Sequence, residues 1–248
     1  MAATLVVATG QQPIDGPALA RSLRTLADAG YDPVVVAPPA VGAASGLTLA
    51  LGTSRAGRRA VPVVAHVLID PLDPALAHPP EMASPEPLAV LETEAIAALA
   101  RSGFAVVVAD SRPVVPHRLA RGSGALSDGD YEPATAALDP AACARRLAGD
   151  LGAGVLVFVT GDEGPPWTGD IDVREAEDHL AAAPPHAAEL VAAARFLRAG
   201  GELAVLTTAT GLPGAISSPP TDRGSALRIH RTLARPRSDA PAVAAGWC

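Results

Sequence analysis

Four residues, Thr160, Gly161, Asp162 and Glu163, have the side chains and the position expected of a ligand-binding loop. They follow the sequence VLVFV at 155–159, which lacks polar alternation and is therefore predicted to be a strand buried on both faces. The four residues would leave the carboxyl end of that strand, which is where ligands bind in open α/β sheets. They locate a candidate site without naming its ligand, and the alternative is a solvated turn.

A further carboxylate, that of Asp139, precedes a predicted helix over 141–151. Pro140 fits the first helical position, where its missing N–H costs nothing, and Gly152 fits the left-handed position that ends many helices. The Asp139 side chain can cap this helix by accepting a backbone hydrogen bond. The sequence thus predicts a helix, a tight turn, a buried strand and a loop over 138–164.

The rest of the chain alternates predicted strands with predicted helices. Strands are predicted over 4–8, 34–37, 61–68, 104–109 and 203–207, and helices over 16–29, 88–101, 172–179 and 187–198, with a further helix around 47–51. A proline-rich stretch occupies 69–86, and a polar stretch over 118–137 is predicted to be a hairpin or an ordered flap. This alternation predicts a three-layer αβα sandwich with a mostly parallel, doubly wound sheet. One domain over 1–235 and a loose tail over 236–248 are expected.

The composition limits the classes of function. The 248 residues are 49% hydrophobic and carry a formal net charge of −7; acidic and basic residues are interspersed, which argues against a nucleic-acid-binding surface. No apolar run reaches the roughly 18 residues of a membrane span, and no basic segment precedes the first apolar run, so no signal peptide is expected. The cysteines and histidines lack metal-ligand spacing, and no metal site is predicted. We expect a cytoplasmic protein.

The sequence contains no lysine, because all 19 basic residues are arginine. A Schiff base, a lysine general base and a lysine contact to phosphate are therefore excluded. Arginine can replace lysine as a charge, but its planar guanidinium has a different shape. The sequence also lacks a P-loop, a nucleophile elbow and a dinucleotide-binding fingerprint.

The order of motifs resembles carbamate kinase, a member of the amino acid kinase superfamily. The segment over 138–164 is similar to the family's aspartate–lysine–aspartate helix start, ELGAD-like turn and buried strand with a TDVDG-like nucleotide loop. The segment VAHVLIDPLDPALAHP over 64–79 resembles the family's strand and DxxDPAF-like stretch, and ELVAAARFLRAGGELAVLTT over 189–208 resembles its late helix and strand. The resemblance covers about 3–229 and implies the amino acid kinase fold, ATP or ADP with Mg²⁺, a carbamate-type acceptor and a homodimer.

The resemblance also implies roles for individual residues. Asp139 would orient the transferring phosphate, as the alternative to a helix cap, and the loop over 160–163 would contact the nucleotide's ribose or adenine. Gly10 and Gln11 stand where the family has a GGNA phosphate loop, and Gly42 is what remains of an HGNGP-like loop. For Gly10, a tight turn between strand and helix is the alternative to an anion site.

The departures from the family pattern fall on positions that hold phosphate. Gln11 replaces a glycine, and Pro140 and Glu189 stand where the family has lysines. Phosphoryl transfer depends on positioning and on cations and N–H groups that stabilise the moving charge. Arg112, predicted to follow the strand over 104–109 into the cleft, is the residue placed to offset these losses, and it is a candidate catalytic residue together with Asp139.

Three functions therefore remain open. The first is a carbamate kinase-like enzyme that exchanges phosphate between ATP and a carbamate-type acceptor, with reduced activity. The second is a catalytically inactive pseudokinase retained for binding a small ligand or a partner, and the third is an enzyme of changed chemistry in the same cleft. A homodimer is expected from the resemblance and from apolar residues on more than one face of the predicted helix over 88–101.

Overall fold

The computed structural model describes residues 3–9, 14–37, 59–77, 84–116, 131–180, 182, 184–217 and 226–231. Several predicted features lie outside these residues: the loop positions Gly10, Gln11 and Gly42, the helix around 47–51 and the tail over 236–248.

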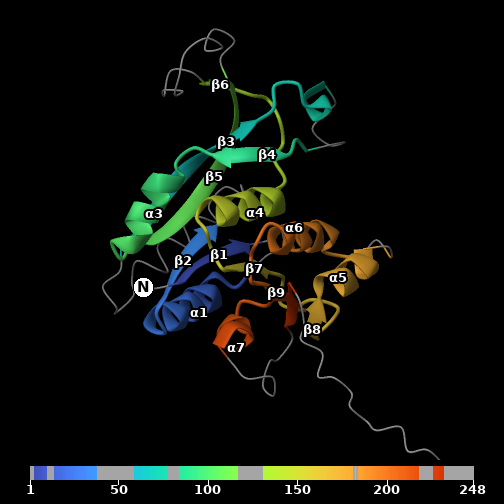
Figure 1. Ribbon diagram of the computed structural model, residues 1–248. Helices are drawn as coiled ribbons and strands as arrows, with labels where there is room; N and C mark the ends of the chain where they lie inside the picture. Colours follow the sequence, from blue (N-terminus) through green and yellow to red (C-terminus); the bar gives the residue numbers. More distant parts are fainter. Residues whose placement is uncertain are drawn as a thin grey trace, which may run out of the picture.

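The described chain alternates strands and helices around one sheet (Figure 1). The strands are β1 (Ala3–Thr9), β2 (Tyr31–Val36), β3 (Ala60–Ile69), β4 (Pro87–Val90), β5 (Ala105–Pro116), β6 (Tyr131–Pro133), β7 (Val155–Val159), β8 (Gly169–Asp172), β9 (Leu203–Thr207) and β10 (Leu227–His230). The helices are α1 (Gly16–Asp28), α3 (Thr93–Arg101), α4 (Pro140–Asp150), α5 (Val173–Leu180), α6 (Ala187–Arg198) and α7 (Leu212–Ser217), with a 3₁₀ helix η1 (Pro74–Ala77).

The sheet has ten strands in the order β4-β3-β5-β2-β1-β7-β9-β10-β8, and β6 pairs with β5. Every neighbouring pair from β3 to β9 in this order is parallel. The carboxyl ends of these strands therefore lie at one edge of the sheet, where open α/β folds bind ligands.

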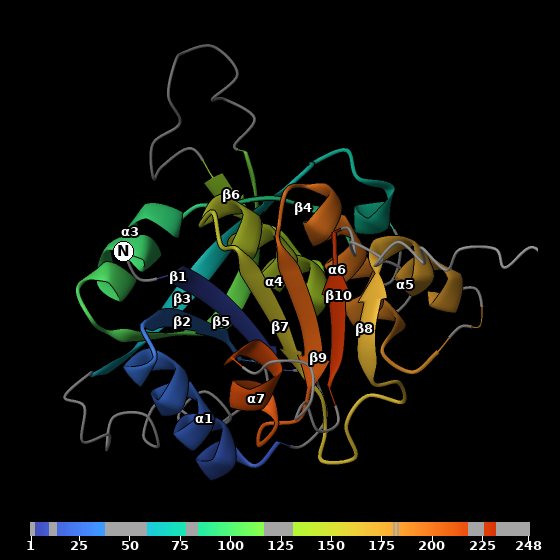
Figure 2. The same cartoon turned by 60° about the horizontal axis from the view of Figure 1, so that its bottom comes forward.

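Two hydrophobic clusters show that helices cover both faces of the sheet. On one face, buried side chains of α3, α4, α5 and α6 pack on the strands, and on the other face those of α1 and α7 do so. Figure 2 shows α1 and α7 together on their side of the sheet. The predicted three-layer αβα sandwich with a mostly parallel sheet is confirmed.

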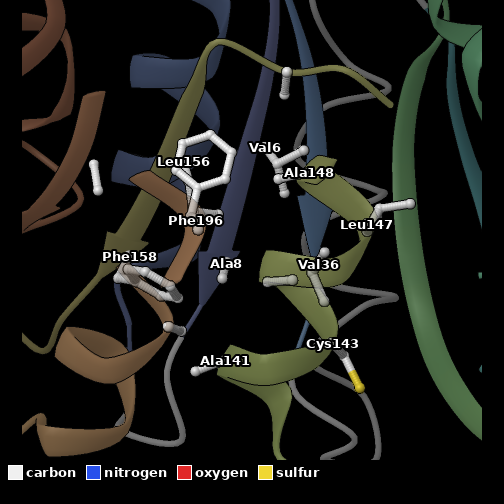
Figure 3. Packing of buried hydrophobic residues seen from close by; sticks show 14 of the residues in the cluster. Val6, Ala8, Val36, Ala141, Cys143, Leu147, Ala148, Leu156, Phe158 and Phe196 are labelled. Carbon is white, nitrogen blue, oxygen red and sulfur yellow. The ribbon is translucent and has the colours of Figure 1, made fainter. Parts of the chain in front are cut away.

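The segment from Asp139 to β7 forms as its sequence predicts. Asp139 caps α4, Pro140 occupies its first turn, and Gly152 adopts a left-handed φ of 62° after its end. Leu147 and Ala148 of α4 are buried against the sheet, where β7 is almost entirely enclosed. Figure 3 shows this packing, with α4 lying across the strands that lead to the carboxyl edge.

The predicted helix over 88–101 is wrong in its first part. Residues Pro87–Val90 form the edge strand β4, which pairs antiparallel with β3, and the helix begins only at Thr93. Leu88 lies on β4 with 47% of its surface exposed. The apolar residues that suggested a two-sided apolar helix are thus divided between a strand and a helix, because pairing with β3 overrides the local helix propensity.

The predicted end of the fourth strand is also wrong. Strand β5 continues from Ala105 to Pro116, so Asp110, Arg112 and their neighbours belong to a strand and not to a loop. The continuation pairs with β3 on one side and with β6 on the other. The stretch over 118–137, predicted to be a hairpin or an ordered flap, is described over 131–137. There, strand β6 pairs antiparallel with the end of β5.

Beyond β9, the sheet ends with two strands, β10 and β8, that the sequence did not predict. Strand β10 pairs antiparallel with β9 and parallel with β8. Together they extend the sheet beyond the parallel strands and support α5. No helix in the described part of the chain combines the length and apolar character needed to cross a membrane.

Candidate functional site

A cavity of about 340 Å³ lies at the carboxyl edge of the sheet. It is lined from the strands by Ala8, Thr9, Phe158, Thr160 and Gly161, from the start of α4 by Asp139, Pro140 and Ala141, and from the start of α6 by Pro185, His186, Ala188 and Glu189. Four segments far apart in the sequence thus meet at one site. Its volume is within the range of small-molecule and cofactor pockets.

The parallel sheet brings the first two of these segments together. Strands β1 and β7 are hydrogen-bonded neighbours with Ala8 opposite Phe158 and Thr9 opposite Val159. The residues at and just beyond the ends of these strands therefore lie side by side. Helices α4 and α6 pack on each other above the strands, and both begin at the cavity (Figure 1).

Asp139 occupies two roles in this arrangement. Its Oδ1 accepts a hydrogen bond of 3.1 Å from the Ala141 N–H, which makes it the cap that the sequence predicts. The same side chain lines the cavity. Capping satisfies an N–H of the first helical turn, and the carboxylate keeps further acceptor capacity for a ligand or a cation.

The predicted nucleotide loop divides between the cavity and the surface. Thr160 is buried, its N–H donates to the Thr207 carbonyl over 2.8 Å, and it lines the cavity together with Gly161. Asp162 and Glu163 are exposed in the turn that follows and are absent from the cavity lining. The structure therefore brings Thr160 and Gly161 to Asp139, and leaves the two acids beside them in solvent.

The start of α6 is the part of the site that the sequence did not predict as such. His186 adopts a left-handed φ of 69°, and its side chain makes no capping hydrogen bond to the helix. Glu189 lies in the first turn, with its Oε1 3.7 Å from the His186 Nδ1. The sequence signal was the position of Glu189, which stands where the resemblance places a lysine.

The charge lining the cavity is negative. Asp139 and Glu189 contribute carboxylates, His186 contributes an imidazole, and the described part of the lining includes no arginine. Among the described residues, no group of three or more His, Cys, Asp or Glu side chains could hold a metal ion by itself.

Arg112 lies on β5 outside this cavity. Ser111, its neighbour, lines a separate cavity of about 220 Å³ with Pro140 and Cys143 of α4. Because side chains alternate along a strand, Arg112 points to the opposite face of the sheet. There its Nε donates to the Asp110 Oδ2 over 2.8 Å, with 62% of the Arg112 side chain exposed.

Comparison with known proteins gives a consistent picture. No family model matches the chain. The carbamate kinase-like protein YahI of Escherichia coli (strain K12) is 27% identical over 209 residues, a match that covers 64% of this chain and 63% of YahI. The matched part thus spans less than two thirds of the length of that relative.

Solved structures agree over nearly the whole chain. Carbamate kinase from Giardia lamblia bound to AMP-PNP superimposes with a TM-score of 0.74 at 17% identity, over 93% of this chain and 99% of the other. The protein of project APE1968 from Aeropyrum pernix K1 gives a TM-score of 0.69 at 19% identity, over 92% and 100%. The chain therefore has the carbamate kinase fold, and its sequence is distantly similar to that of a carbamate kinase-like protein.

Proposed function

We propose that this chain binds ATP or ADP in the cavity between β1, β7, α4 and α6, and that it transfers phosphate to a carbamate-type acceptor slowly or not at all. The observation that carries the proposal is the cavity itself. It lies at the carboxyl edge of a parallel sheet and at the starts of two helices. Both features favour a phosphorylated ligand, since helix N-termini present N–H groups and positive dipole ends to anions.

In this proposal the phosphates lie toward Thr9, Asp139 and His186. The nucleoside lies toward Thr160 and Gly161, with Asp162 and Glu163 beside it at the surface. The structure of the Giardia lamblia carbamate kinase with AMP-PNP supports the choice of ligand. The loop positions Gly10, Gln11 and Gly42, which lie outside the described residues, are included as contacts to phosphate or acceptor on the resemblance alone.

The residues present fit a nucleotide-bound Mg²⁺. This ion is usually held by one or two carboxylates, by waters and by substrate phosphates, and the Asp139 carboxylate, which lines the cavity, is the residue that would hold it. When bound, Mg²⁺ would neutralise charge on the phosphates. The protein's own part is to present the Asp139 carboxylate from the start of α4.

Reduced turnover follows from the charges. A moving phosphoryl group is stabilised by cations and by close N–H groups, whereas this chain has no lysine and places a carboxylate at Glu189. Arg112 is exposed and paired with Asp110, and it does not line the cavity. These observations also favour the second candidate, a pseudokinase that binds nucleotide without transferring phosphate.

Titration calorimetry with Mg²⁺ and ADP tests the binding proposal. We expect weak binding, with a dissociation constant of about 1 mM, which corresponds to a binding free energy of about −4 kcal/mol. The matched variant is Asp139→Asn, which keeps a capping side chain but removes the charge. This variant should change the affinity for Mg²⁺ and ADP and leave the melting temperature of the protein unchanged. No detectable binding would contradict nucleotide recognition, and a low-micromolar constant would contradict the loss of phosphate contacts.

A homodimer is also part of the proposal, on the basis of the resemblance. The predicted two-sided helix that first suggested it is replaced by β4 and α3, and within α3 the buried side chains are Ile96 and Ala100. Light scattering at micromolar concentration distinguishes dimer from monomer. A mass of one chain, 24.9 kDa, would contradict this part of the proposal.

A further inference from the structure

A second groove, of about 350 Å³, is lined by residues of α4 and α6 and by the segment 84–86. Many of the lining residues are small, such as Ala142, Ala188 and Ala192. Helices α4 and α6 lie side by side in Figure 1, and their residues are in contact. The groove shares Asp139 and Ala188 with the nucleotide cavity, so the two lie next to each other.

Two arginines from different helices meet at one carboxylate in this groove. Arg145 of α4 donates from Nη2 to the Glu86 Oε1, and Arg195 of α6 donates from Nη1 to the Glu86 Oε2 over 2.7 Å. Paired guanidiniums around a carboxylate or a phosphate are a common way for proteins to bind anions, because the planar donors match these groups. Glu86 therefore occupies the position of an anionic ligand.

The contacts of Glu86 differ from those of a bidentate ion pair elsewhere in the protein. Arg198 and Glu177 form a bidentate pair with hydrogen bonds of 2.8 and 2.7 Å. Glu86 instead receives one hydrogen bond from each arginine, and the buried Arg145 Nε has no hydrogen-bond partner among the described residues. A ligand with more oxygen atoms than one carboxylate could use this remaining donor.

The segment around Glu86 is held by contacts that do not involve the Glu86 side chain. That side chain is 47% exposed, so its charge would pass into water. Strand β4, which begins at the next residue, is held independently by pairing with β3 and by the Val90 N–H, which donates to the Asp150 Oδ2 over 2.9 Å. Arg195 is 56% exposed, which leaves its guanidinium accessible to a ligand from solution.

We propose that the groove is a binding site for a small oxyanion, a molecule with carboxylate or phosphate groups, and that Glu86 is its internal competitor. Arg145 and Arg195 bind the anion when the Glu86 side chain swings out. This site is distinct from the nucleotide cavity and does not depend on the function proposed for it.

The test is titration calorimetry on the full chain with sodium succinate and, separately, sodium phosphate at constant ionic strength. Glu86→Gln removes the competing charge and should bind one probe about tenfold tighter than the wild-type protein. Arg195→Gln should bind that probe about tenfold more weakly than the wild-type protein. A response to succinate identifies a carboxylate ligand, and a response to phosphate identifies a phosphorylated one.

Glu177→Gln and Arg198→Gln are the matched controls, since they break the bidentate pair, and both should bind like the wild-type protein. If Glu86→Gln binds neither probe more tightly than the wild-type protein, Glu86 forms a purely structural ion pair with the two arginines and the proposal is wrong. If circular dichroism shows that Glu86→Gln does not fold, the proposal is tested by comparing Arg195→Gln with Arg198→Gln. Equal binding by Arg195→Gln and Arg198→Gln, or no binding by the wild-type protein at millimolar probe, then overturns the proposal.

Discussion

Asp139 and Glu189 line the same cavity, Asp139 as the cap of α4 and Glu189 in the first turn of α6. Because two carboxylates repel phosphate, we expect Glu189→Lys to tighten the binding of Mg²⁺ and ADP by about tenfold, about 1.4 kcal/mol. Titration calorimetry measures this beside Glu189→Gln and beside Glu94→Lys, an equal charge change at an exposed position on α3. Weaker binding by both Glu189 variants would instead identify Glu189 as a Mg²⁺ ligand.

The exposed pair of Arg112 and Asp110 gives a prediction about turnover. Loss of a preorganised donor to a reacting group costs about 2.7–4 kcal/mol, or 10²–10³ in rate. Since Arg112 does not line the cavity, Arg112→Ala should form ATP from carbamoyl phosphate and ADP at the same slow rate as the wild-type protein. A coupled assay on the two purified proteins decides. A rate usual for kinases in the wild-type protein that disappears in Arg112→Ala would establish Arg112 as a catalytic cation.

Burial raises the pKa of the Cys143 thiol from 9.0 to about 12, and the nearby Asp139 carboxylate adds to the shift. The unfolded chain therefore loses this proton near pH 9, while the folded chain keeps it until about pH 12. Between these values the unfolded state binds fewer protons, so the free energy of unfolding falls as pH rises, by up to about 1.4 kcal/mol per pH unit. Below pH 9 the contribution of the buried thiol is complete.

Urea denaturation at pH 8 and pH 10, on the wild-type protein and on Cys143→Ala, isolates this effect. The substitution creates a small cavity whose cost is the same at both values. The stability difference between the two proteins should therefore shrink by about 1 kcal/mol at pH 10. Parallel losses in both proteins would show that Cys143 does not titrate in this way.

Gly201 allows the turn after α6 to pass close to a buried ring. A Cβ atom at this position would lie 2.3 Å from the Phe196 Cε1, and Phe196 is 3% exposed in the core shown in Figure 3. Gly201→Ala should therefore destabilise the fold by about 1–3 kcal/mol. Gly149→Ala is the control, because its Cβ would meet nothing within 4 Å in helix α4, and it should stabilise the protein by about 0.5–1 kcal/mol. Chemical denaturation measures both, and equal effects would contradict the close contact.

The sequence by itself determined the fold class and the segment from Asp139 to Thr160. The signals there are local: a capping carboxylate, a proline in the first turn, a glycine after the helix and an uninterrupted apolar strand. Each of these signals acts over a few residues, and the tertiary contacts do not override any of them. The sequence also placed Thr160 and Gly161 at the carboxyl edge, since a buried parallel strand has only one such end.

The tertiary structure alone decided which side chains meet. Pairing with β3 turned Pro87–Val90 into a strand and extended β5 through Arg112, which moved that arginine from an expected cleft to an exposed face. Packing of α6 on α4 brought Glu189 to Asp139 and Arg195 to Glu86. These partners are far apart in the chain, and their meeting depends on strand order and helix packing, which no local pattern of residues specifies.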